Sequence, residues 1–217
     1  MSLCQAKHYD LVIVGAGMVG ASLACILDKA SLERPLKILL VESAPVELNA
    51  PPAQPSFDAR STVLSYGTVD YLRKQEFWQA IESDAQAITR IHVSDQGHFG
   101  SAWLSSEEQG VEALGYVIEN RLLGSQFNQV LSAANSIELC HSVKVSALIP
   151  GASGMAVQLD NGNDQEEITT ELVVLAEGGR SGLCEQLGIH RNTESYNQSA
   201  IIANVAFTNS HDNVAYE

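Results

Sequence analysis

Three glycines directly after an apolar run constrain this chain more than any other feature. Residues 9–14 read YDLVIV, and Gly15, Gly17 and Gly20 follow in the spacing G-x-G-x-x-G. A strongly apolar run of strand length is typical of a parallel sheet that is covered on both faces. In this spacing the first glycine permits a tight turn, the second lets a pyrophosphate approach the backbone, and the third lets helix and strand pack closely. The alternative is a strand-to-helix turn that binds no ligand.

An acidic residue after the next predicted strand favours the ligand-binding alternative. Apolar residues recur with helical spacing over 18–30, and residues 37–41 (KILLV) read as a second buried strand. Together with the first strand they predict a βαβ unit. Glu42 stands 22 residues after Gly20, close to the ~20 expected for an acid that binds an adenosine ribose. We therefore predict a site for FAD or NAD, in which the helix N-terminus binds the pyrophosphate.

The rest of the chain does not continue as regular βα units. Residues 88–94 and 99–104 alternate around an Asp-Gln-Gly turn, which predicts an antiparallel hairpin that is foreign to a purely doubly wound sheet. We further predict helices over 67–82 and 121–134, and strands over 137–140, 143–149, 155–159, 165–170, 172–176 and 200–207.

Composition excludes several classes of function. The net charge is −14, from 26 acidic and 12 basic residues, so we expect no nucleic-acid partner. No apolar stretch reaches the roughly 18 residues that cross a bilayer, and the N-terminus lacks the features of a signal peptide, which predicts a cytoplasmic protein. His92 and His98 do not have ligand spacing, so we predict no metal site. The four cysteines form no CxxC pair and are expected to be reduced: Cys4, Cys25, Cys140 and Cys184.

The glycine run and three further segments follow one another in a characteristic order along the chain. They are VIVGAGMVGASLACIL with VE at 41–42, FDARSTVLSYGT at 57–68, NRLLGSQF at 120–127 and VVLAEGGRSGL at 173–183. The chain resembles the flavoprotein aromatic hydroxylases, which are FAD monooxygenases of the p-hydroxybenzoate-hydroxylase-like family. The segment AITRIHVSDQGHFG at 87–100 is most similar to the ubiquinone-biosynthesis branch. The resemblance covers essentially the whole chain.

The resemblance implies an α/β fold with a Rossmann-like FAD-binding domain, in which a parallel sheet is joined to an antiparallel β-meander. This domain would comprise residues 1–85 and 105–190. Residues 86–104 and 191–217 would form an incomplete sheet of a second, mostly β substrate domain. Members of the family are nearly twice as long, so we expect the chain to be an N-terminal piece that binds FAD weakly or not at all and does not hydroxylate on its own.

The resemblance assigns two arginines to the cofactor site, and a third follows one of its motifs. Arg60 corresponds to an arginine near the flavin and the pyridine nucleotide, and Arg121 to one that pairs with the FAD phosphates. A guanidinium is a forked donor suited to phosphate oxygens. Arg180 would help to hold a phosphate or to cap its loop. Standing alone, Arg60 or Arg121 would fit a surface salt bridge equally well.

Three more residues receive cofactor-binding roles from the resemblance. The backbone at Val145 would meet the adenine, although this residue also fits an ordinary sheet position. Glu177 and Gly178 stand where the family has an Asp-Gly motif that contacts FAD and is implicated in NADPH binding. The glutamate is one methylene longer than the family's aspartate, so its reach differs. The resemblance assigns no catalytic residue within this chain.

The activity implied by the resemblance is FAD-dependent and consumes NADPH or NADH together with O2. Its substrate would be a hydrophobic prenylated phenol of ubiquinone biosynthesis. Such a substrate dissolves in membranes, so we expect peripheral contact with the inner face of the cytoplasmic membrane or with a ubiquinone-biosynthesis complex. Two alternatives stay open at this point: an NAD-dependent oxidoreductase and a non-catalytic dinucleotide-binding module.

Overall fold

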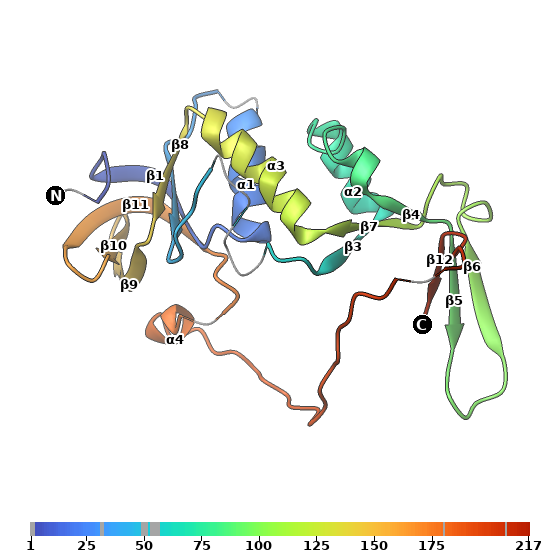
Figure 1. Cartoon of the computed structure of the whole chain (residues 1–217). Helices are drawn as coiled ribbons and strands as arrows, with labels where there is room; N and C mark the ends of the chain where they lie inside the picture. The colour runs from blue at the N-terminus through green and yellow to red at the C-terminus, as the bar shows by residue number, and fades with distance from the viewer. Residues whose placement is uncertain (1–2, 31–32, 49–51, 53–56, 180, 207) are drawn as a thin grey trace. The chain divides into compact units, whose positions relative to one another are not determined.

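A computed structural model describes residues 3–30, 33–48, 52, 57–179, 181–206 and 208–217. The chain forms two compact units. The first comprises Met1–Asp58 and Gly124–Gln198, and the second comprises Ala59–Leu123 and Ser199–Glu217 (Figure 1). The assignment of residues 1–85 and 105–190 to an FAD-binding domain, and of the remainder to a substrate domain, stays a prediction.

The first unit contains a six-stranded sheet that is parallel in one half and antiparallel in the other. Its strand order is β8-β2-β1-β11-β10-β9. Strand β1 pairs in parallel with β2 and β11, and β2 pairs in parallel with β8. Strands β9, β10 and β11 form the predicted antiparallel meander. The strands are β1 (His8–Val14), β2 (Ile38–Glu42), β8 (Ile137–His141), β9 (Lys144–Gly151), β10 (Gly154–Asp160) and β11 (Gln165–Leu175).

Both faces of β1 and β2 are buried, as their apolar runs predict. The run over 172–176, also predicted to be buried, is not: Leu172 near the end of β11 is 59% exposed and the residues after it are half-buried. Helix α1 (Met18–Lys29) packs closely against β1, where Gly20 lies beside the side chain of Ile13. Helix α3 (Asn120–Ala133) lies next to α1 (Figure 1), and Cys25 Sγ is 3.8 Å from the carbonyl oxygen of Phe127. Side chains alternate between the two faces of a strand. The residues of β1 and β2 that face away from α1 form a hydrophobic cluster with the meander. The cluster includes Val12, Val14, Leu39 and Val41 with Leu148, Val157, Leu159 and Ile168.

The carboxylate of Asp10 fixes the chain where it enters β2. It accepts hydrogen bonds from the Arg34 guanidinium at 2.8 Å and from the Lys37 amide at 2.6 Å. The hydrogen bond from Arg34, followed by that from Lys37, lowers the pKa of the Asp10 carboxyl below its usual value. The charged carboxylate therefore stabilises the folded chain above the unfolded pKa of about 3.9, and this contribution is lost as pH falls through the lower folded pKa.

We expect Asp10→Asn to lower the free energy of unfolding by about 1 kcal/mol at pH 7, because the hydrogen bonds to a charged acceptor are weakened. Urea unfolding measured between pH 7 and pH 2 should show this difference shrinking below pH ~4, where the wild-type carboxyl also becomes neutral. Glu47→Gln removes a charge at an exposed position and serves as the matched control. A difference between Asp10→Asn and the wild type that does not change with pH would refute this role.

The second unit contains two three-stranded sheets. The first has the order β3-β7-β4, and the second has the order β12-β5-β6. Strands β5 and β6 form the predicted antiparallel hairpin, with Ser94 opposite Ser101. Helix α2 (Tyr66–Lys74) begins after Ser65, whose side chain accepts a hydrogen bond from the amide of Thr68. The strands are β3 (Ser61–Ser65), β4 (Gln86–Ile88), β5 (Arg90–Ser94), β6 (Ser101–Ser105), β7 (Gly115–Glu119) and β12 (Val214–Tyr216).

Two predicted elements differ from the structure. The helix predicted over 67–82 ends at Lys74, because Glu76 adopts a left-handed backbone with φ of 60°; only a short 3-10 helix, Glu82–Asp84, follows. The strand predicted over 200–207 is wrong for residues 200–206, which have no regular structure, and residue 207 lies outside the described residues. Ile201 is 96% exposed, so the apolar pattern there has no neighbouring strand to cover it.

The other differences concern the boundaries of one strand and several short elements that were not predicted. The two strands predicted over 165–170 and 172–176 are one continuous strand, β11. Strands β3, β4, β7 and β12 were not predicted, apart from the overlap of Ile88 with the hairpin. A short helix α4 (Leu183–Gln186) follows β11. Within the described part of the chain, no helix has the length and apolar character needed to cross a membrane.

Candidate dinucleotide-binding site

The turn between β1 and α1 leaves no room for a side chain at its first and third glycines. The Gly15 amide donates to the carbonyl of Val41 at 2.7 Å, and Gly15 has a φ of 101°. A Cβ atom at Gly15 would lie 2.7 Å from the carbonyl oxygen of Ala176, and one at Gly20 would lie 1.8 Å from the carbonyl oxygen of Gly15. The first and third glycines are therefore required by the close approach of the turn, α1 and the end of β11.

The N-terminus of α1 carries donors that its own sequence does not satisfy. Gly17 is the N-cap residue and provides no side-chain hydrogen bond, and the first turn contains no acidic residue. The first amides of a helix lack partners within the helix, and the helix dipole gives this end a partial positive charge. A pyrophosphate would supply both the missing acceptors and the negative charge, so this part of the structure fits the phosphates of a dinucleotide.

Glu42 is held directly at the glycine turn. One carboxylate oxygen accepts a hydrogen bond from the Ala16 amide at 2.8 Å, and the other accepts one from the Ala44 amide at 2.8 Å. The side chain is half-buried. The oxygen that accepts from Ala44 also accepts from the Ser43 hydroxyl at 3.2 Å. The oxygen that accepts from Ala16 has a second lone pair, which can accept a hydrogen bond from a ribose hydroxyl. The structure thus brings together the two sequence features from which the site was predicted, 26 residues apart in the chain.

Val145 and the Glu177–Gly178 pair approach the same end of the sheet. The Val143 amide donates to the Glu42 carbonyl at 3.1 Å, and Val145 follows in β9 as a buried residue of the core cluster. Glu177 comes directly after the Ala176 carbonyl that contacts the Gly15 turn. The hydroxyl of Ser181 donates to the Glu177 carboxylate at 3.0 Å, and Gly178 has a φ of 74°.

These positions surround the carboxyl ends of parallel strands, which is where ligands bind in open α/β sheets. The individual roles proposed for Val145, Glu177 and Gly178 toward a cofactor stay predictions. Arg180, predicted to contact a phosphate or its own loop, lies outside the described residues.

Arg60 and Arg121 belong to the second unit. Arg121 forms an ion pair with Glu119 at 2.5 Å, with 59% of its side chain exposed. The carbonyl oxygen of Arg60 accepts a hydrogen bond from the Asn120 amide at 2.9 Å, so the two arginines lie at adjoining backbone positions. Arg121 therefore makes the surface salt bridge that the sequence left open as an alternative, and its phosphate-binding role stays a prediction.

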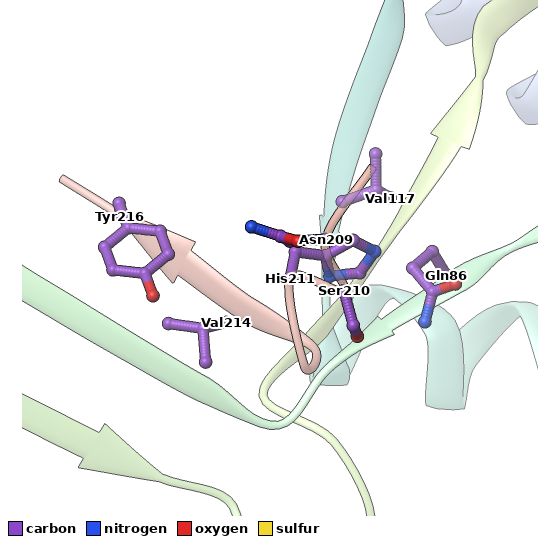
Figure 2. Close-up of a pocket in the computed structure, with 7 residues that line it drawn as sticks. All are labelled: Gln86, Val117, Asn209, Ser210, His211, Val214 and Tyr216. Atoms are coloured by element: carbon purple, nitrogen blue, oxygen red, sulfur yellow. The ribbon is translucent and has the colours of Figure 1, made fainter. Parts of the chain in front are cut away.

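A largely apolar groove of about 600 Å³ in the second unit was not predicted from the sequence. Figure 2 shows that its walls come from β4, β7 and β12 and from the segment before β12. No local pattern marks these residues, because they meet only when distant strands pair. The lining residues are Gln86, Val117, Asn209, Ser210, His211, Val214 and Tyr216. Within the part of the chain that the structure describes, no group of three or more His, Cys, Asp or Glu side chains could hold a metal ion.

Comparison with known proteins supports a flavin rather than a nicotinamide dinucleotide. Residues 8–215 match the family described as FAD binding domain. The ubiquinone hydroxylase UbiL of Rhodospirillum rubrum is 30% identical over 97% of this chain. The human mitochondrial ubiquinone biosynthesis monooxygenase COQ6 is 27% identical over 96% of this chain. The matched region makes up 47% and 46% of these two relatives, so the chain spans about half of their length.

The fold is shared with solved flavin enzymes. The crystal structure of p-nitrophenol 4-monooxygenase PnpA from Pseudomonas putida DLL-E4 superimposes with a TM-score of 0.68 at 16% sequence identity, over 84% of this chain and 44% of that protein. The predicted α/β fold, with its parallel sheet and antiparallel meander, is confirmed by this likeness and by the observed strand order.

Proposed function

Because this chain belongs to the FAD-binding-domain family, we propose that it forms the ADP-binding part of a flavin monooxygenase acting in ubiquinone biosynthesis. The observation that carries this proposal is the contact between Glu42 and the glycine turn. It places a negatively charged acceptor beside an uncapped helix N-terminus, and these two features are what an adenosine ribose and a pyrophosphate require.

The residues of the first unit have distinct tasks toward FAD. The amides of the Gly15–Gly20 turn and of the first turn of α1 bind the pyrophosphate. Glu42 orients the adenosine through its ribose, and the backbone near Val145 meets the adenine. The negative charge of Glu42 disfavours a nucleotide whose ribose carries a 2′-phosphate. When bound, FAD supplies the redox chemistry that amino-acid side chains lack, namely the uptake of hydride and the reaction with O2.

The finer assignments follow from the same family. The electron donor is NADPH or NADH, the oxidant is O2, and the substrate is a prenylated phenol of the ubiquinone pathway. Support comes from the names of the relatives, which are ubiquinone hydroxylases and monooxygenases. A substrate of this kind is dissolved in the membrane, so the protein acts at the inner face of the cytoplasmic membrane, by peripheral contact or within a ubiquinone-biosynthesis complex.

A hybrid protein tests this proposal. The matched part of the Rhodospirillum rubrum UbiL relative is replaced by this chain, and the hybrid is expressed in a strain that lacks its ubiquinone hydroxylase. We expect the purified hybrid to contain FAD and the strain to regain hydroxylated quinone, measured by mass spectrometry of lipid extracts. A hybrid without flavin would refute the cofactor assignment. A hybrid that retains FAD but hydroxylates no quinone precursor would refute the proposed pathway.

A further inference from the structure

We propose that Cys4 and Cys140 form a peroxide-sensitive thiol pair, which hydrogen peroxide converts into an intramolecular disulfide that fastens residues 3–7 to the edge of the sheet. Residues 3–7 are called the N-terminal segment below. The pair is outside the dinucleotide site, and the inference does not depend on the proposed function.

The two sulfur atoms are already in contact. Cys4 Sγ lies 3.8 Å from Cys140 Sγ, although the two residues are 136 positions apart in the chain. Cys4 is 5% exposed and Cys140 is 6% exposed. Cys140 is on β8, an outer strand of the six-stranded sheet, and its thiol donates to the carbonyl oxygen of Leu3 at 3.3 Å. A disulfide bond is about 2.05 Å long, so the sulfurs need to approach by less than about 2 Å.

Polar contacts on both sides of Cys4 hold the N-terminal segment in this place. The Gln5 amide donates to the Glu138 carboxylate at 2.7 Å, and the Leu3 amide donates to the Glu166 carboxylate at 2.5 Å. Glu138 belongs to the same strand as Cys140, whereas Glu166 belongs to β11. Because two separate strands hold the backbone that flanks Cys4, the meeting of the sulfurs is a consequence of the fold.

The hydrogen bond between the thiols makes them chemically different. Cys4 donates its S–H to Cys140, which lowers the pKa of the Cys140 thiol, while burial and nearby carboxylates oppose this effect. The same hydrogen bond, followed by burial, raises the pKa of Cys4. Of the two thiols, Cys140 therefore loses its proton more readily than Cys4, and to do so it gives up its hydrogen bond to the Leu3 carbonyl. Since the thiolate is the nucleophile, Cys140 is the thiol that attacks the oxidant.

The reaction consumes one molecule of hydrogen peroxide and releases two of water. The Cys140 thiolate attacks one peroxide oxygen, so that an S–O bond forms, the O–O bond breaks, and the departing hydroxide takes up the proton lost by Cys140. The Cys4 sulfur then attacks the Cys140 sulfur. The S–S bond forms, the S–O bond breaks, and the hydroxyl leaves as water with the proton of Cys4. The two sulfurs together lose two electrons, which the peroxide gains.

The disulfide would join residues of the first unit that are 136 positions apart, and the loop that it closes includes Ala59–Leu123 of the second unit. Cys140 is paired in register with Val41, next to Glu42 in β2, so the cross-link ties the N-terminal segment to the strand that neighbours the Glu42 strand. Closing a loop of more than 100 residues restricts the unfolded chain strongly. We expect the oxidised protein to melt about 5–10 °C higher than the reduced protein.

Peroxide treatment of the 217-residue chain tests the proposal. The native protein is treated with a small excess of hydrogen peroxide, its remaining thiols are alkylated, and its peptides are mapped by mass spectrometry without reduction. We expect one linked peptide pair, Cys4 with Cys140, lighter than the two separate peptides by two hydrogens. The free thiols should fall from four to two, and dithiothreitol should reverse the change. In Cys4→Ser, Cys140 should stop at a sulfenic acid that dimedone traps.

The same treatment in 8 M urea is the control, because it needs no variant to fold. There the disulfides should be a mixture that involves all four cysteines. The proposal is overturned if the native protein gives no Cys4–Cys140 peptide, if it gives the same mixture as the unfolded chain, or if Cys4 and Cys140 are oxidised separately to sulfinic acids.

Discussion

Gly20→Ala is expected to abolish FAD binding and to lower the free energy of unfolding by about 3 kcal/mol. A Cβ atom at this position would lie 1.8 Å from the carbonyl oxygen of Gly15 and 3.2 Å from Cγ2 of Ile13. The first contact is with backbone, which no side-chain rotation relieves. Helix α1 would therefore have to move away from β1, and the amides of the turn would no longer converge on a phosphate. Urea unfolding and titration with FAD measure the two effects.

Gly151→Ala is the matched control in the same sheet. Its Cβ atom would meet the carbonyl oxygen of Gly154 at 3.5 Å, which is an ordinary van der Waals contact, so both stability and FAD affinity should stay within about 0.5 kcal/mol of the wild type. Similar losses in Gly151→Ala and Gly20→Ala would mean that the close helix–strand approach at Gly20 has no special importance.

Glu42→Ala is expected to weaken FAD binding by about 10–100-fold, because hydrogen bonds to a charged acceptor contribute about 1.5–3 kcal/mol. The Ala16 and Ala44 amides would also lose their acceptor, so the turn itself becomes less well ordered. Glu42→Gln keeps one oxygen acceptor and should fall between the wild type and Glu42→Ala. Titration calorimetry with FAD measures the order of the three proteins.

Glu47→Ala provides the comparison for this series, since Glu47 is exposed on the chain that follows β2. Its affinity for FAD should equal that of the wild type. An equal loss in Glu47→Ala would show that the overall negative charge, and not the position of Glu42, governs binding.

The sequence was sufficient for the dinucleotide half of the fold because its signals are local. The run over 9–14, the three glycines and Glu42 are all contained within one βαβ unit, and the geometry of that unit determines that they meet. The meander was also predictable, since β9, β10 and β11 follow one another and pair as neighbours. The contact between Glu42 and the turn follows from the spacing that identified both.

Elements that depend on distant partners were not predictable. Strand β3 pairs with β7, where Ser61 lies opposite Glu119, and neither five-residue strand has a pattern strong enough to stand out alone. For residues 200–206 the error is the opposite one, since a strand was predicted where none forms. An alternating pattern does not form a strand without a neighbouring strand to pair with. Helix α2 ends after Lys74 because Glu76 has a left-handed backbone conformation, which glutamate rarely adopts.

Titration of the 217-residue chain with FAD, ADP and FMN, in the wild type and in Glu42→Ala, tests the dinucleotide site most directly. FAD and FMN share the flavin, whereas FAD and ADP share the adenosine and the pyrophosphate. We predict that FAD binds weakly but measurably, that ADP competes with it, that FMN does not bind, and that Glu42→Ala weakens the binding of FAD and of ADP to the same degree. Binding of FMN as tight as that of FAD, or FAD binding unaffected by Glu42→Ala, would contradict the assignment of the glycine turn and Glu42 as the binding site for the ADP half of FAD.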